Sequence, residues 1–379
     1  GYFEELIRKY LLENPHGCIM TLVPKKGLAA QREKELEEKL EAYRSSLSEE
    51  QLDAMVEKTK ALEAYQEAGE DPKALECIPM LKRSDIKREA AKIINEELTV
   101  DDSLFLYHDV CTNGIGYVDL MFKTDSIAPE QIPYLGLLKS VLGYVDTENY
   151  SYGELFNEIN ANTGGINCGV EVFDRADSTE EFQAMFSVRG KALYTKMDFL
   201  FKMIGEILNS SKLEDTKRLY EIVASVKSRA QVNLTGAGHS TAVLRAAAYS
   251  SPMAAFQDEM AGIGYYQFIE KLEKDFEQRK EETVEELCKL MKKILRPENF
   301  MISYTGERES METVQKLAGA VKAGLGTEPV EKSEEKLTCT KKNEGFKTSG
   351  QVQYVAQTGN FKKKGLEYTG ALEILKVIL

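Results

Sequence analysis

Histidine is scarce in this chain of 379 residues, and the positions of the histidines exclude one common kind of metal site. The three histidines are His16, His108 and His239, and none has another histidine nearby. A zinc site of the common metallopeptidase type needs two imidazoles and a carboxylate on one helix, as in HExxH or HxxEH, and neither pattern occurs. We therefore expect no zinc-binding histidine pair in this chain.

The segment Thr235-Gly236-Ala237-Gly238-His239-Ser240 contains the residue types of a phosphate-binding loop. Such a loop should follow a strand and open a helix, whereas the residues before this segment have a helical pattern. His239 beside Ser240 is adjacency in sequence and not a catalytic triad, and no GxSxG elbow is present. We expect a flexible turn between two helices here.

Gly164 and Gly165 are the candidates for substrate binding. They lie in Thr163-Gly164-Gly165-Ile166, between an expected helix at 152–162 and an expected strand at 169–173. Glycines before a strand permit a positive φ and the close approach of another backbone. Two interpretations stay open, a simple turn, which is the commoner case, and a sheet edge that accepts an extended peptide by strand addition.

The composition excludes several classes of protein. The net charge is −13, from 49 basic and 62 acidic side chains, which argues against a general nucleic-acid binder. No window holds 18 uncharged apolar residues, so we expect no membrane span. The six cysteines form no CxxC pair and are typical of reduced, mostly buried thiols in an intracellular protein: Cys18, Cys77, Cys111, Cys168, Cys288 and Cys339.

The elements before residue 97 are predicted to be mainly helical. The pattern predicts a helix at 1–13 and a strand from His16 to Val23, ended by Pro24. Residues 28–68 predict two helices joined by a Ser-rich turn, in which Ser48 and Gln51 form a capping box. This αα-hairpin is followed by a connector at 73–96.

The remainder predicts an α+β fold, with a mostly antiparallel sheet and helices packed on one face. The predicted strands are 104–110, 115–122, 169–173, 182–188 and 300–304. The predicted helices are 129–145, 152–162, 192–210, most of 213–295, and 310–325. A linker at 326–350 should lead to a strand at 352–356 that begins a new unit.

The last residues, Thr369 to Leu379, have the pattern of an apolar helix without a stop signal. We therefore expect this chain to be a piece of a longer polypeptide. Residues 350–379 are expected to mediate oligomerisation or to be poorly ordered, because their apolar side chains would lack a partner.

Several segments then agree, in order and spacing, with one family. They are Asn14-Pro15-His16, Ser84-Asp85-Ile86, Thr112-Asn113-Gly114-Ile115, Ser151-Tyr152-Gly153-Glu154-Leu155 with NANTGGI, GHSTAVLRAAAYSSP at 238–252, Arg296-Pro297-Glu298-Asn299-Phe300, and Thr369-Gly370-Ala371-Leu372. Together they resemble the carboxy-terminal half of the presequence proteases, a branch of the insulinase/pitrilysin family of zinc metallopeptidases.

The resemblance implies four α+β modules in two halves that close around a chamber. Residues 1–24 would end a preceding module, 25–97 would form the helical hairpin linker, 98–330 the third module, and 331–379 the truncated start of the fourth. Zinc would be bound by HxxEH and a distal Glu in the amino-terminal half. The corresponding helix here carries Gly136, Lys139 and Ser140, so the resemblance implies a silent module with no catalytic residue and no bound metal.

The full-length protein would accordingly be a zinc metalloendopeptidase of unstructured peptides, and this chain its inactive, chamber-forming and substrate-enclosing half. Its partners would be peptide substrates and the amino-terminal half of the same polypeptide. The resemblance implies an intracellular location, in the cytoplasm of a bacterium or in the mitochondrial or plastid matrix of a eukaryote. Two alternatives remain, an inactive pitrilysin-like structural or peptide-binding subunit, and an unrelated α+β scaffold whose hairpin binds partners.

Overall fold

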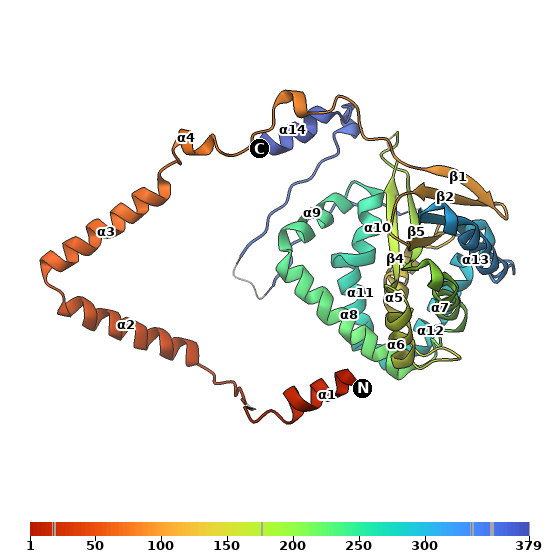
Figure 1. Ribbon diagram of the computed structural model, residues 1–379, viewed down its shortest axis with the longest axis horizontal. Helices are drawn as coiled ribbons and strands as arrows, with labels where there is room; N and C mark the ends of the chain where they lie inside the picture. The colour runs from red at the N-terminus through yellow and green to blue at the C-terminus, as the bar shows by residue number, and fades with distance from the viewer. Residues whose placement is uncertain are drawn as a thin grey trace. The chain divides into compact units, whose positions relative to one another are not determined.

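The computed structural model describes the whole chain except residues 17, 19, 176, 334, 336, 349–351 and 379. The described residues divide into two units, 1–90 and 91–379, whose elements are labelled in Figure 1.

The first unit is helical. Helix α1 (Tyr2–Ile7) continues as a π-helical stretch (Arg8–Leu12), and α2 (Leu28–Ser46), α3 (Glu49–Glu67) and the short α4 (Pro72–Leu75) follow. The capping box is confirmed, because Ser48 accepts a 3.3 Å hydrogen bond from Gln51 N and its own N–H donates to Gln51 Oε1 at 2.9 Å. No residue of α2 or α3 is buried, so the packing of the two helices as a hairpin stays a prediction.

The predicted strand from His16 to Val23 is wrong for the residues of that segment that the structure describes, which form no strand. Gly17 and Ile19 lie outside the described residues. A strand needs a neighbouring backbone to complete its hydrogen-bond ladder, and no neighbour pairs with these described residues.

The second unit contains one six-stranded sheet of order β1-β2-β6-β3-β5-β4. Its strands are β1 (Glu96–Val100), β2 (Ser103–Asp109), β3 (Ile115–Lys123), β4 (Ile166–Asp174), β5 (Phe182–Leu193) and β6 (Phe300–Gly306). Only the pair β2–β6 is parallel, so the mostly antiparallel sheet is confirmed. Strand β1 was not predicted, since its hairpin with β2 turns at Asp101 and Asp102, non-glycine residues with positive φ.

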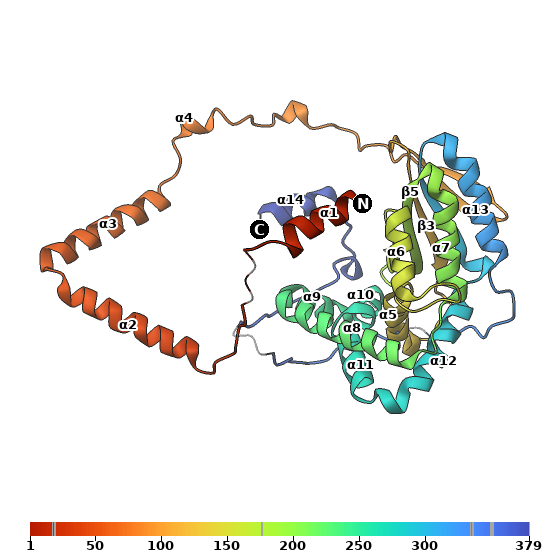
Figure 2. The same ribbon diagram turned by 60° about the horizontal axis from the view of Figure 1, so that its bottom comes forward.

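Helices cover one face of this sheet. They are α5 (Ile132–Val141), α6 (Tyr152–Asn162), α7 (Met197–Ser210) and α13 (Met311–Ala323), and Figure 2 shows α6 and α7 in front of the strands. Side chains from the sheet, such as Leu120 and Phe186, share a buried core with Leu200 and Ile204 of α7. Helix α7 begins later than predicted, because β5 continues to Leu193 before the chain turns.

Five further helices lie between α7 and β6: α8 (Thr216–Gly236), α9 (Gly238–Ala248), α10 (Pro252–Ala261), α11 (Ile263–Lys274) and α12 (Phe276–Ile294). The predicted break near Gly236 is confirmed at Ala237, which lies between α8 and α9. The alternation of strands and helices therefore gives the α+β fold that the sequence predicts.

The chain beyond α13 has little regular structure. The described residues of 326–361 form no helix or strand, and a short 3₁₀ turn (Lys362–Lys364) and helix α14 (Gly370–Ile378) follow. The predicted strand at 352–356 is wrong, because no strand lies beside it and Val355 is 86% exposed. None of the described helices is long and apolar enough to cross a membrane.

Candidate functional site: the free edge of the sheet

Strand β4 is the last strand of the sheet and pairs on one side only. Its nine residues pair with β5 in antiparallel register, from Ile166 opposite Gly190 to Asp174 opposite Phe182. No other strand of the described residues lies along its outer side. An edge of this kind presents unpaired N–H and C=O groups that can pair with another extended chain.

The hydrogen bonds of β5 show which residues of β4 face outward. Thr124 N donates to Ala184 O at 3.2 Å and Tyr194 N donates to Gly114 O at 2.9 Å, so the even-numbered residues of β5 bond toward β3. Hydrogen-bonding direction alternates along an antiparallel strand, so the odd-numbered residues of β5 bond toward β4. The backbone groups that face the free side of β4 are therefore those of its even-numbered residues: Ile166, Cys168, Val170, Val172 and Asp174.

The side chains of these outward-facing residues help to fix the strand. Those of Ile166, Cys168, Val170 and Val172 pack against the hydrophobic core. Burial raises the pKa of the Cys168 thiol to about 12, so this cysteine is neutral at physiological pH. The strand therefore presents its backbone to the outside while its apolar side chains anchor it.

Gly164 and Gly165 lie at the start of this edge and have different roles. Gly165 has a φ of +105°, a conformation that residues with a side chain rarely adopt. Gly164 donates to Lys191 O at 2.8 Å, and a Cβ at its position would meet the side chain of Lys191. Thr163 Oγ1 accepts a 3.0 Å hydrogen bond from Gly165 N, which completes the turn from α6 into β4. The glycines build the turn, and the edge that they lead into is the candidate binding surface.

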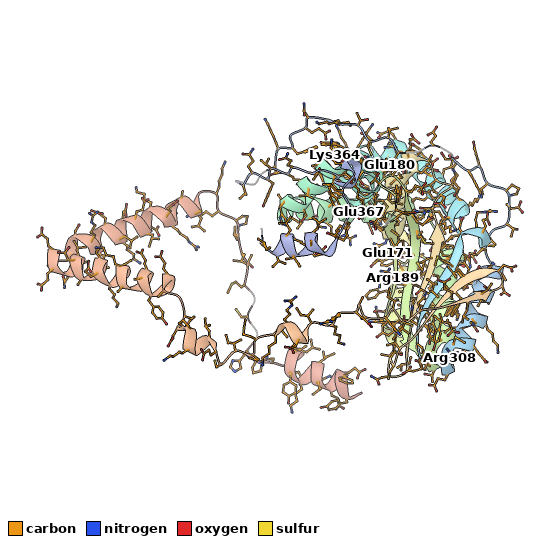
Figure 3. All side chains as sticks on the ribbon, turned by 90° about the horizontal axis from the view of Figure 1, so that it is seen from above. Glu171, Glu180, Arg189, Arg308, Lys364 and Glu367 are labelled. Carbon is orange, nitrogen blue, oxygen red and sulfur yellow. The ribbon has the colours of Figure 1, made fainter. Side chains whose placement is uncertain are left out.

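The face of the sheet opposite the helices carries a charged group that the sequence did not single out. Arg189 of β5 lies 2.8 Å from Asp119 of β3 and 3.1 Å from Glu171 of β4, and Figure 3 shows Glu171 and Arg189 close together. Burial is the main cause of a raised pKa of Asp119, which the hydrogen bond and the charge of Arg189 oppose. Arg189 thus ties the edge strand to the two strands behind it.

Helix α5 corresponds, by the resemblance, to the helix that carries HxxEH in the family's active module, and its residues Gly136, Lys139 and Ser140 are not metal ligands. A Cβ at Gly136 would overlap the backbone oxygen of Met260 and the ring of Tyr265, so no ligating side chain has room there. Lys139 is a cation whose pKa burial lowers. Ser140 donates to Gly136 O at 3.4 Å within its own helix. No group of three or more His, Cys, Asp or Glu side chains within the described part of the chain is arranged to hold a metal ion.

The three histidines belong to different segments and have different neighbours. His16 belongs to the first unit, where its N–H donates to Asn14 Oδ1 at 2.9 Å. His108 of β2 makes hydrogen-bond contacts with Ile94 O at 2.8 Å and Ser303 Oγ at 3.1 Å. The ring of His239, in the predicted turn region, lies 6.3 Å from the ring of Tyr354.

The feature that sequence reasoning missed is the outward direction of alternate backbone groups. Strand order and register decide it, and the residue types of β4 do not encode either. A partial signal exists, since Ile166, Cys168, Val170 and Val172 alternate with Asn167, Gly169 and Glu171. This alternation predicts a strand with one buried face but not its place at the edge of the sheet.

Comparison with known proteins gives the chain a family and several relatives. Residues 22–272 match the family model of a domain associated with peptidases of the M16 family, subfamily C. Protein HypA of Clostridium perfringens is 36% identical over 379 residues, which are 100% of this chain and 39% of HypA. Presequence protease 1, chloroplastic/mitochondrial, of Arabidopsis thaliana is 27% identical over 377 residues, which are 98% of this chain and 34% of that protein.

A crystal structure described as a peptidase M16 inactive domain from Pseudomonas fluorescens aligns with a TM-score of 0.43 and 15% identity, over 64% of this chain and 54% of that one. The chain spans 39% of HypA and 34% of the Arabidopsis protease, well under half of either length. Because the matched family model covers more than half of the chain, the chain belongs to this peptidase-associated family, within the insulinase/pitrilysin family.

Proposed function

We propose that this chain is the non-catalytic, chamber-forming half of a zinc metalloendopeptidase and that it holds unstructured peptides along β4. Its family and its similarity to presequence proteases support the peptidase assignment. The observation that carries the binding role is the unpaired outer side of β4, along which alternate residues direct their N–H and C=O groups outward.

This edge suits peptides that have no structure of their own. Strand addition uses main-chain hydrogen bonds, which every peptide can form whatever its sequence. A folded protein has already paired most of its buried backbone groups and offers no free segment. The edge would therefore select for unstructured chains.

We assign the catalytic step to the amino-terminal half of the longer polypeptide, where the zinc site HxxEH is expected. Zinc bound there would activate a water molecule for peptide hydrolysis. This chain would contribute no ligand, because its helix α5 offers Gly136, Lys139 and Ser140 at the corresponding place. Its partners would be peptide substrates and that amino-terminal half. The location would be the cytoplasm of a bacterium or the mitochondrial or plastid matrix of a eukaryote.

The second candidate function is that of an inactive structural or peptide-binding subunit. The absence of metal-ligating side chains from the described part of α5 is compatible with it. The two functions differ in the full-length protein, since only a peptidase would contain zinc and cleave a quenched fluorescent peptide. Measuring zinc content and cleavage in parallel decides between them.

The binding role can be tested by removing one outward N–H. Proline at an edge position whose N–H faces outward leaves the hydrogen bonds to the neighbouring strand in place. In the full-length protein, Val170→Pro should raise KM for a quenched fluorescent peptide about fivefold. This factor corresponds to the loss of one hydrogen bond that contributes about 1 kcal/mol to binding. Val170→Ala is the matched control, because it loses the same side chain and keeps the N–H. Equal KM values for the two variants would refute binding along β4.

A further inference from the structure

A stretch of chain after α13 is tied to helix α9 by charged and aromatic contacts. We call residues 339–348 and 352–368 the strap. Glu344 of the strap accepts hydrogen bonds from Arg245 Nε at 2.8 Å, from Arg245 Nη2 at 3.0 Å and from Tyr249 Oη at 2.6 Å. The guanidinium of Arg245 also lies 5.8 Å from the ring centre of Phe346. A two-pronged arginine–carboxylate pair of this kind fixes both distance and orientation.

The anchor for this pair is rigid. Arg245 Nη1 donates to Asp258 Oδ2 at 2.6 Å, and Asp258 is only 1% exposed. Asp258 also accepts hydrogen bonds from the N–H groups of Ile263 and Gly264, each at 3.1 Å. The buried carboxylate of Asp258 fixes the orientation of the guanidinium. The Nε and Nη2 atoms of Arg245 are therefore already directed toward the position of Glu344 when the strap binds.

A second contact follows along the strap. The ring of Tyr354 packs on Gly238, where a Cβ atom would overlap it, and it lies beside the ring of His239. The glycine-rich segment that contains the residue types of a phosphate-binding loop is therefore a packing surface for the ring of Tyr354. The strap has two attachment points on one helix, Arg245 and Gly238.

The docked strap forms one wall of a cavity at the end of β4. The cavity has a volume of about 830 Å³, within the range of about 300–1,000 Å³ that is typical of ligand pockets. The β4–β5 connection and the α9–α10 corner form the other walls, and Figure 3 labels Glu180 and Glu367 from two of the three walls. Its apolar lining comes from Phe182, Met253, Phe361, Leu366 and Tyr368.

The charges at the cavity are partly paired: Glu181 lies 3.5 Å from Arg175, and Lys362 and Glu367 are further charged side chains of the lining. Lys363 of the strap lies 2.6 Å from Glu180 and donates to Ser250 O at 2.8 Å. Asp174, the last residue of β4, also lines the cavity. An extended chain beside β4 would therefore lead directly to a pocket whose lining includes large apolar side chains.

From these contacts we propose that docking of the strap through Glu344 completes a subsite that takes one large apolar side chain of the peptide bound along β4. This inference rests on the proposed function, because the peptide backbone must first lie on the edge strand. The subsite would favour peptides with a large apolar side chain near one end. Release of the strap would remove a wall and with it this preference.

Two peptides test the subsite in the full-length protein. Both are unstructured, dye-labelled peptides that differ at one position near an end, where one carries Leu and the other Ala. A series of such pairs places this position at successive residues from each end. Burying the additional apolar surface should make the better Leu peptide bind about tenfold more tightly, as measured by fluorescence anisotropy. Glu344→Lys should abolish this advantage, because it places a cation against Arg245. The matched control is Glu331→Lys, the same charge change at an exposed residue that precedes the strap.

A second variant tests the strap independently, in case Glu344→Lys disturbs folding. Gly238→Ala adds a methyl group where Tyr354 packs, while alanine favours the helix that glycine disfavours. It should also reduce the advantage of the Leu peptide, and limited proteolysis should cut the strap faster in Gly238→Ala and Glu344→Lys than in Glu331→Lys.

The outcomes separate the two proposals. Equal binding of the Leu and Ala peptides to the unaltered protein at every scanned position would overturn the subsite and leave the edge strand as the binding surface. A Leu advantage that survives Glu344→Lys would overturn the role of the strap. Failure of both peptides to bind would overturn the proposed function, and the subsite with it.

Discussion

The guanidinium of Arg189 lies 2.8 Å from the carboxylate of Asp119, directly across the ladder between β5 and β3. The side chain of Asp119 is only 17% exposed, and among the described residues no group donates to its Oδ1 atom. Arg189 therefore compensates a carboxylate that is poorly solvated.

Replacing Arg189 with Ala should lower the free energy of unfolding by about 1–3 kcal/mol, because Asp119 would lose its charged donor. The pKa of Asp119 should rise further. The loss of stability should be largest at neutral pH, where Asp119 is charged in the unfolded state. It should shrink as pH falls, because a carboxyl group with a raised pKa in the folded state binds its proton there first. Urea denaturation at several pH values measures this. The double variant with Asp119→Asn should recover part of the loss, and a loss equal to the sum of the single changes would contradict the coupling.

Gly165 and Gly164 should respond differently to alanine. Gly165→Ala forces a side chain into a backbone conformation with φ of +105° and should cost about 1–2 kcal/mol. Gly164→Ala meets only the flexible side chain of Lys191, which can move away, so its cost should be small. Denaturant midpoints of the two variants provide the comparison, and equal destabilisation would show that the turn is not as described.

Gly136 should tolerate no larger residue. A methyl group there meets the backbone oxygen of Met260 as well as the ring of Tyr265, and backbone cannot turn aside as a side chain can. Gly136→Ala should destabilise the second unit by about 1–3 kcal/mol, as expected for an overpacked contact between helices. Ser140→Ala, one turn away in the same helix, is a control that should cost less. Thermal unfolding measures both, and a neutral Gly136→Ala would contradict the close packing of α5.

Attachment of the strap should depend on pH in the acid range. The hydrogen bonds from Arg245 are the largest cause that lowers the pKa of Glu344, from 4.5 to about 2. A lowered carboxyl pKa gives stability that is fully present above 4.5 and is lost as pH falls toward 2. A dye on Lys347→Cys, in a chain whose other exposed cysteines are replaced, should show increasing mobility by fluorescence anisotropy over that range. Glu344→Gln should remove this transition, and an unchanged transition would assign it to other groups.

The cysteines should differ in reactivity. The expectation that the cysteines are mostly buried is wrong, because Cys18, Cys77 and Cys111 lie in segments that pack against no core and are exposed. Burial raises the pKa of Cys168 to about 12. Thiol labelling at pH 8 should modify the first three at least about a hundredfold faster than Cys168. Mass spectrometry of peptides from a time course measures the order. Fast labelling of Cys168 would mean that β4 readily leaves the core against which this side chain packs.

The sequence alone determined those helices and strands whose residue patterns involve only neighbouring positions in the chain. The capping box at Ser48 and Gln51, the helix from Tyr152 to Asn162 and the alternation of buried residues in β6 depend on near neighbours in the chain. Such patterns specify an element before any tertiary contact forms. The order of motifs also sufficed for the resemblance to the insulinase/pitrilysin family.

Only the tertiary structure decided the role of each element. The predicted strand at 352–356 is instead part of the strap. The ring of Tyr354 packs on Gly238, and no strand of the described residues pairs with this segment. The binding edge exists because β4 is the last strand, which depends on pairings between residues far apart in sequence. Arg245 likewise meets Glu344 across 99 positions of the chain. Hydrogen-bond partners at such separations depend on the complete fold, and no local pattern of residue types specifies them.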